Sequence, residues 1–96
     1  MQKIHDMISK PALFEQLAEE ATELAHAALK YARILREENP TPVTPEEGYA
    51  KIVEEYSDLI QCSRILDIPT DEEQIEVKYH RWVKRRLEQL AEGERI

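Results

Sequence analysis

Five acidic residues in two short stretches are the residues of this sequence whose types and spacing suggest chemistry. The stretch "AEEATELAH" (18–26) carries Glu19, Glu20 and Glu23, and the stretch "VEEYSDL" (53–59) carries Glu55 and Asp58. Residues three positions apart lie about one turn apart on nearly the same face of a helix. Each stretch therefore offers one pair of carboxylates, Glu20 with Glu23 and Glu55 with Asp58.

Both pairs border apolar positions. Seven-residue steps from Glu20 lead to Leu13 and Ala27, and the same step from Glu55 leads to Cys62. We therefore expect Glu55 to be buried and Glu20 to lie at the edge of an apolar seam. Carboxylates in such places cost free energy unless a positive charge compensates them.

A divalent cation is the natural compensation for two acidic pairs that face each other. Mg²⁺ and Mn²⁺ are hard cations that prefer oxygen ligands, and no set of imidazoles and thiolates is present to suggest zinc. An acidic pair on a single helix usually faces water. Two pairs on consecutive helices, each beside apolar residues, favour a metal site over a solvated surface.

Three helices must position these carboxylates, at about 11–36, 45–66 and 71–91. Pro11 suits the first turn of a helix, and Pro40 and Pro42 in "ENPTPVTP" end the first helix. Thr44 and Glu47 around Pro45 have the spacing of a capping box that starts the second helix. The third helix is expected to start in the same way, with Thr70 and Glu73 as the capping pair.

The apolar pattern predicts one all-α domain over residues 1–96. The expected seam of the first helix consists of Phe14, Ala21, Ala28 and Leu35, interleaved with Leu17, Leu24 and Tyr31. The residues expected to point inward from the third helix are Ile75, Tyr79, Trp82, Val83, Leu87 and Leu90. A chain of 96 residues forms a marginal core alone. We therefore expect a helical bundle that is completed by oligomerisation.

The composition limits the binding partners and the cellular compartment that we expect for this protein. A net charge of −7 makes nucleic acids and anionic membranes unfavourable partners. No apolar run approaches the roughly 20 residues that span a bilayer, and the first residues lack a signal-peptide core. Cys62 is the only cysteine, which suits a reducing environment. The expected location is the cytoplasm.

The order and spacing of the acidic motifs resemble the MazG-like family of all-α nucleoside triphosphate pyrophosphohydrolases. The motifs are "EEATE" (19–23) and "EYSD" (55–58), and the turn "NPTP" (39–42) is also similar. The resemblance covers roughly residues 11–90. It implies Mg²⁺-dependent hydrolysis of an NTP or dNTP to the monophosphate and pyrophosphate by a metal-activated water, in a homodimer or homotetramer.

The resemblance also implies roles for individual residues. The metal ligands would be Glu20, Glu23, Glu55 and Asp58, with Mn²⁺ as a possible substitute for Mg²⁺. Glu19 matches the first glutamate of the motif, so it would orient a ligand or assist the attacking water. The base and sugar preference stays open.

A basic strip on the third helix offers contacts for phosphates. Lys78, Arg81 and Arg85 fall on one helical face, and the resemblance implies that residues of this helix bind the triphosphate. The other interpretation is that basic residues late in a helix complement its dipole. Asn39, at the start of the "NPTP" turn, would contact substrate or simply end the first helix.

Three alternatives compete with this hypothesis. Glu23 and His26 form the Glu-x-x-His half-motif of di-iron carboxylate bundles, although the helical phase turns His26 outward with Glu19. A non-enzymatic helical interaction module would instead pair its carboxylates with the basic third helix. A phosphoribosyl-ATP pyrophosphohydrolase-like enzyme is related in fold and chemistry, but its local sequence pattern is not found.

Overall fold

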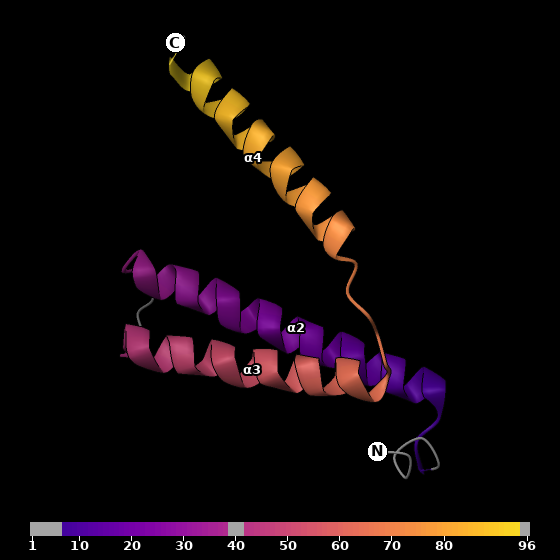
Figure 1. The fold of residues 1–96 in the computed structure, drawn as a ribbon. Coiled ribbons are helices and arrows are strands. Elements are labelled where there is room, and N and C mark those ends of the chain that lie inside the picture. Colours follow the sequence, from indigo (N-terminus) through magenta and orange to yellow (C-terminus); the bar gives the residue numbers. More distant parts are fainter. Residues whose placement is uncertain (1–6, 39–41, 95–96) are drawn as a thin grey trace.

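The chain is a helical hairpin followed by a separate third helix. The computed structural model describes residues 7–38 and 42–94, and over these ranges it contains α2 (Lys10–Leu35), α3 (Pro45–Ile65) and α4 (Glu72–Glu94) and no strand (Figure 1). The all-α prediction is confirmed, and each boundary lies within about three residues of the predicted one. None of these helices combines the length and apolar character that a membrane span requires.

The first two helices start at the residues that the sequence indicates. The Ser9 hydroxyl accepts a hydrogen bond from the Ala12 N–H at 3.3 Å, and the Thr44 hydroxyl accepts one from the Glu47 N–H at 3.1 Å. Each bond satisfies one of the N–H groups that the first turn of a helix leaves without a partner. A proline follows in the first turn in both cases.

The predicted cap of the third helix was wrong by one residue. Asp71, and not Thr70, begins α4, because the Asp71 Oδ1 accepts a hydrogen bond from the Gln74 N–H at 3.0 Å. The Thr70 hydroxyl instead donates to Glu72 Oε1 at 3.0 Å. An ionised carboxylate is the stronger acceptor at the positive end of a helix, so it displaces the hydroxyl.

Both hairpin helices end on a residue with left-handed backbone. Glu37 has φ of 59° and Asp67 has φ of 54°. The N–H of the following residue bonds back to the Arg33 carbonyl at 2.9 Å after α2 and to the Ser63 carbonyl at 3.1 Å after α3. These bonds satisfy carbonyls that the last turn leaves open, and they are typical of the Schellman motif.

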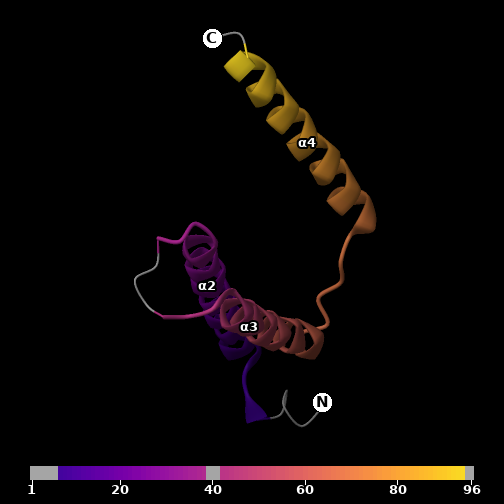
Figure 2. The same ribbon diagram turned by 90° about the vertical axis from the view of Figure 1, so that its left-hand side faces the viewer.

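The core lies between α2 and α3, which run side by side in opposite directions (Figures 1 and 2). The buried residues form one column at seven-residue spacing on each helix: Leu13, Ala27 and Ile34 on α2, and Gly48, Glu55 and Cys62 on α3. Small residues of α3 face large ones of α2. The Cys62 thiol donates to the Leu13 carbonyl at 3.7 Å, and a Cβ at Gly48 would lie 3.0 Å from Ile34 Cδ1.

The predicted apolar seam of α2 was correct for its interleaved residues Leu17, Leu24 and Tyr31, which are half-buried, and wrong by one position for its other column. Within this chain Phe14 and Leu35 are 45% and 59% exposed, and Ala21 and Ala28 are also exposed. The buried column is instead the one that contains Glu20, next to the predicted seam. Because α2 packs against a single helix, only one of its two apolar stripes is covered.

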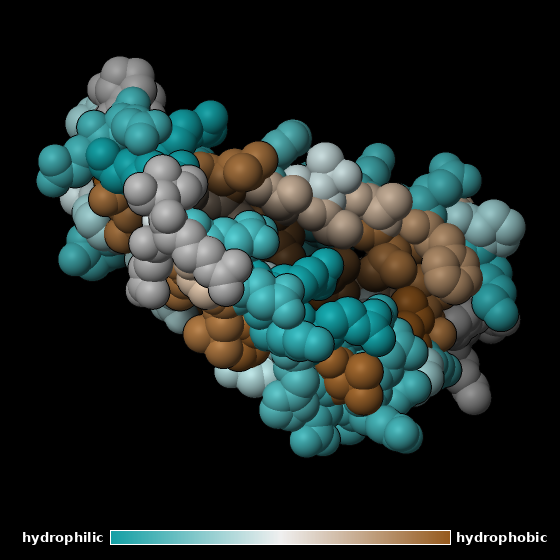
Figure 3. All heavy atoms as spheres, turned by 90° about the horizontal axis from the view of Figure 1, so that it is seen from above, coloured by the Kyte–Doolittle hydropathy of each residue, from teal (hydrophilic) through white to brown (hydrophobic). Residues whose placement is uncertain are grey.

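The third helix stands away from the hairpin (Figures 1 and 2). The radius of gyration is 18.2 Å, whereas a compact chain of this length has about 12–13 Å. The residues of α4 that were expected to point inward are exposed by half or more at Ile75, Tyr79, Trp82, Leu87 and Leu90, and only Val83 is half-buried. Hydrophobic side chains are open to solvent among hydrophilic ones (Figure 3). The chain alone therefore does not complete the predicted bundle.

Candidate metal centre

Three carboxylates meet between the two helices of the hairpin. Glu20 and Glu23 of α2 and Glu55 of α3 each place one oxygen so that all three atoms lie within 4.8 Å of one another. The two facing columns bring Glu20 and Glu55 to the interface, and Glu23 follows Glu20 by one turn. Glu55 is only 5% exposed, whereas Glu20 is half-buried and Glu23 is exposed.

The two inner carboxylates are each held at one oxygen and left open at the other. The Gln16 amide donates to Glu20 Oε1 at 2.7 Å, and the Lys51 ammonium lies 3.0 Å from Glu55 Oε1. The Oε2 atoms of Glu20 and Glu55 are buried and have no hydrogen-bond partner among the described residues. A buried carboxylate oxygen without a partner is costly, so the arrangement lacks a positive group at these two atoms.

The charges of the cluster are distributed unevenly. The pKa of Glu23 is raised, first by its hydrogen bond with Glu55 and then by repulsion from Glu20 and Glu55. The pKa of Glu55 is lowered, because its hydrogen bond and ion pair with Lys51 outweigh the cost of burial. The two shifts run in opposite directions, so a proton bound by this pair favours Glu23 over Glu55. The same contacts, led by the bond to Glu55, raise the pKa of Lys51.

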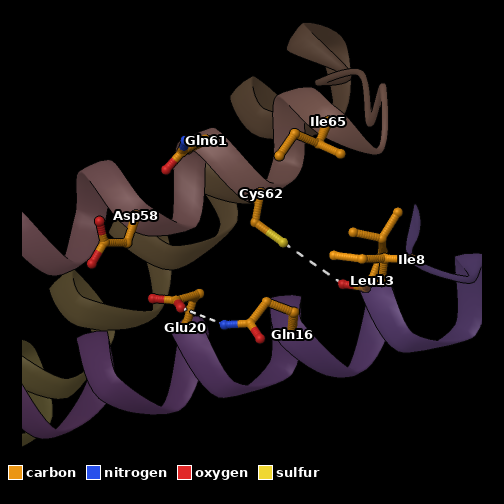
Figure 4. Close-up of a pocket in the computed structure, with 8 residues that line it drawn as sticks. All are labelled: Ile8, Leu13, Gln16, Glu20, Asp58, Gln61, Cys62 and Ile65. Atoms are coloured by element: carbon orange, nitrogen blue, oxygen red, sulfur yellow. Dashed lines mark hydrogen bonds between the residues drawn. The ribbon is translucent and has the colours of Figure 1, made fainter. Parts of the chain in front are cut away.

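Asp58 lies at the rim of the cluster. It lines a pocket of about 410 Å³ together with Glu20 (Figure 4), and its charge contributes to the raised pKa of Glu23. It is not one of the three carboxylates that lie within 4.8 Å of one another. The structure therefore brings together three of the four predicted ligands and places the fourth beside them.

The donor set suits a hard cation. The three clustered groups are carboxylates, and the open oxygens of Glu20 and Glu55 are the atoms that Mg²⁺ or Mn²⁺ would take. Burial and then the charge of Glu20 raise the pKa of the nearby Cys62 thiol, and Cys62 is not one of the clustered groups. Among the described residues the cluster includes no histidine, contrary to the di-iron alternative.

His26 is exposed and is not one of the clustered groups, as its outward helical phase predicted. It lines one pocket together with Glu23 and Glu55, and a second, shallower one together with Glu19 and Glu23. Glu19 itself is exposed on the outer side of α2. The predicted candidate for assisting the water is thus adjacent to Glu20 in the chain but is not one of the three clustered carboxylates.

The predicted phosphate contacts are not brought to the cluster within one chain. Lys78, Arg81 and Arg85 are exposed on α4, which stands away from the hairpin (Figure 1). Arg85 lines a small hollow of α4, where the Arg86 guanidinium lies 5.5 Å from the centroid of the Trp82 ring. Asn39 lies outside the described residues.

The sequence interpretation missed the two residues that hold the carboxylates. Gln16 precedes Glu20 by four residues, and Lys51 precedes Glu55 by four. Side chains at this spacing contact each other on a helix, so the pattern was available. The contact between Lys51 and Glu55 also shows that this buried acid of α3 is paired within its own helix and not with the basic residues of α4.

Comparisons with known proteins found no match that bears on this site. No protein-family model matches the chain, and neither a curated protein nor a solved structure matches it.

Proposed function

We propose that this protein is a Mg²⁺-dependent nucleoside triphosphate pyrophosphohydrolase related to the MazG-like enzymes. The observation that carries the proposal is the pair of buried, unpartnered oxygens of Glu20 and Glu55 beside the Glu23 carboxylate. The resemblance of "EEATE" and "EYSD" to the family motifs adds the reaction. An NTP or dNTP and water would give the monophosphate and pyrophosphate.

The bound ion, Mg²⁺ or in its place Mn²⁺, supplies positive charge that offsets phosphate repulsion and acidifies a water. Glu20 and Glu55 would hold it through their open oxygens, and Gln16 and Lys51 keep both carboxylates oriented. Glu23 would be the third ligand.

Two further acids complete the proposed machinery. Asp58 closes the ligand set from the rim of the cluster, where it faces Glu20 across the pocket (Figure 4). Glu19, directly before Glu20 on α2, would orient this ligand or assist the attacking water.

A second copy of the chain completes the bundle in this proposal. The chain exposes 8293 Å², about 2,500 Å² more than a compact monomer of 11.3 kDa. Covering this excess on both copies removes roughly 5,000 Å², the size of an obligate homodimer interface. The exposed apolar residues of α4 then pack on a partner hairpin, which brings Lys78, Arg81 and Arg85 toward the acids. A homodimer, or a homotetramer built from two dimers, satisfies this requirement.

The activity is tested by assaying release of pyrophosphate from a panel of NTPs and dNTPs with Mg²⁺ or Mn²⁺. We expect pyrophosphate from at least one substrate, and no release from Glu20→Gln or Glu55→Gln proteins that keep their helical circular dichroism. Glu15→Gln is the matched control, because Glu15 is exposed on α2 and has no ion pair among the described residues. Release of orthophosphate alone, or no turnover, contradicts the proposal and favours a helical interaction module.

The assembly is tested by light scattering coupled to size exclusion. We expect a mass of two or four chains, and dissociation when Trp82→Glu places a charge on the apolar side of α4. The matched control is Lys84→Glu, which also adds negative charge to α4 but at a residue outside the predicted inward face. A monomer at micromolar concentration refutes the shared bundle.

A further inference from the structure

A second pocket adjoins the acidic cluster on the side of the hairpin loop. Its volume is about 590 Å³, and it is lined by Glu23, His26 and Lys30 of α2 and by Glu47, Lys51 and Glu55 of α3. Two clustered carboxylates, Glu23 and Glu55, thus form one wall of this pocket. Lysines from both helices reach it beside that wall.

The pocket holds positive groups that the rest of the cluster lacks. Lys51 contacts Glu55 at 3.0 Å and Glu54 at 3.5 Å, so it already lies between the acids and the pocket. Lys30 has no ion pair within the described part of the chain and is exposed. His26 adds an imidazole to the lining beside the two lysines, and Glu47 is its third carboxylate after Glu23 and Glu55. Lysine ammonium groups bind phosphate oxygens as point charges.

The pocket on the opposite side of the cluster differs in the charged residues that line it. Glu20 and Asp58 line it with the amides of Gln16 and Gln61, over a floor that includes Leu13 and Ile65 (Figure 4). Among the described residues, no lysine or arginine lines it. Two carboxylates without a basic residue repel phosphate, whereas an apolar floor with amide groups suits a neutral heterocycle.

We propose that the Lys30–Lys51 pocket binds the terminal pyrophosphate group of the substrate, so that the nucleotide lies along the hairpin with its base toward Gln16 and Gln61. This inference rests on the proposed function and adds the direction of the substrate. The reacting α-phosphorus then lies over Glu20 and Glu55, between the two pockets.

The direction fixes where the leaving group goes. The water oxygen forms a bond to the α-phosphorus, and the bond from that phosphorus to the bridging oxygen breaks. The bridging oxygen keeps the electron pair and leaves as part of pyrophosphate, and one proton passes to solvent. The departing charge stays beside Lys30 and Lys51, where it develops.

The test measures binding of inorganic pyrophosphate by calorimetry in the presence of Mg²⁺, without turnover. We expect Lys30→Gln and Lys51→Gln each to weaken this binding about tenfold, the effect of one charge-assisted contact. The matched control is Lys10→Gln, also on α2 but about 30 Å along the helix from Lys30, and it should bind as the wild type does. The pyrophosphate-releasing assay should show the loss in KM for Lys30→Gln more than in kcat.

Two results overturn the inference, and they are distinguishable. If the wild type releases pyrophosphate but both lysine variants bind pyrophosphate normally, the direction is wrong and the proposed function stands. If pyrophosphate binding is instead lost in Lys78→Gln or Arg81→Gln and not in the Lys30 and Lys51 variants, the direction is also wrong, and the pyrophosphate group lies against α4. If the wild type neither responds to Mg²⁺ nor releases pyrophosphate, the proposed function fails and this inference fails with it.

Discussion

Replacing Gly48 by alanine tests the close approach of the two hairpin helices. The new Cβ would lie 3.0 Å from both Ile34 Cδ1 and Tyr31 Cδ1. Carbon atoms pack best at about 3.5–4.0 Å, so the helices or these side chains must move apart by about 0.5–1 Å. Overpacking of this kind costs about 1–3 kcal/mol, while removing a glycine from a helix gains up to about 1 kcal/mol.

The net expectation for Gly48→Ala is a loss of about 1 kcal/mol, with a range from near zero to about 2 kcal/mol. Each kcal/mol lowers the melting temperature of a domain this small by about 4–8 °C. Thermal unfolding followed by circular dichroism at fixed protein concentration measures the change. Because Glu55 lies on the same column as Gly48, the parted helices should also weaken binding of Mg²⁺ at the proposed site.

Gly93→Ala is the matched control. A Cβ at Gly93 meets nothing within 4 Å, so this variant gains helix propensity without a clash. We expect it to unfold at or slightly above the temperature of the wild type. If Gly48→Ala is stabilised as much as Gly93→Ala, the two helices are not in close contact and the packing described above is wrong.

Three further changes test the cluster, the helix ends and the core. Without divalent ions, Glu23→Gln should raise the melting temperature, and increasingly so as pH rises from about 4 toward 7. The reason is that the pKa of Glu23 is raised in the folded protein, so its ionised form destabilises the fold. A change in melting temperature that is independent of pH contradicts this prediction. Glycine at Glu37 or at Asp67 should stabilise by about 1 kcal/mol in thermal unfolding, because it relieves left-handed backbone, whereas Glu38→Gly should not. Leu13→Ala should cost about 2–5 kcal/mol in urea unfolding, and a loss as small as that of exposed Leu29→Ala would refute its place in the core.

The helices and the acidic pairs could be predicted because their signals are local. Thr44 stands directly before Pro45, Ser9 stands two residues before Pro11, and the seven-residue step from Glu55 to Cys62 marks a helical column without any knowledge of the partner helix. At the third helix two adjacent residues, Thr70 and Asp71, offer the same capping spacing. The choice between them depends on acceptor strength, which the pattern does not express.

The packing could be predicted only in part. On α2 two apolar columns lie side by side, one through Phe14 and one through Leu13, and hydropathy alone does not say which faces α3. The Leu13 column, and not the predicted Phe14 column, packs against α3 because Gly48 and Cys62 leave room for Leu13 and Ile34. The position of the basic residues of α4 depends on what that helix packs against, which no spacing within α4 encodes.

In the proposed oligomer, the separation of α4 from the hairpin would divide the folding of this chain into two kinetic steps. Contacts between α2 and α3 require only the closure of a short loop, which is fast and independent of concentration. In the proposed oligomer, docking of α4 is an encounter between chains, and its rate rises with the amount of protein. A freshly made chain would therefore carry its three carboxylates before any basic residue of α4 reaches them. The abundance of the chain would then set how many of its sites are complete.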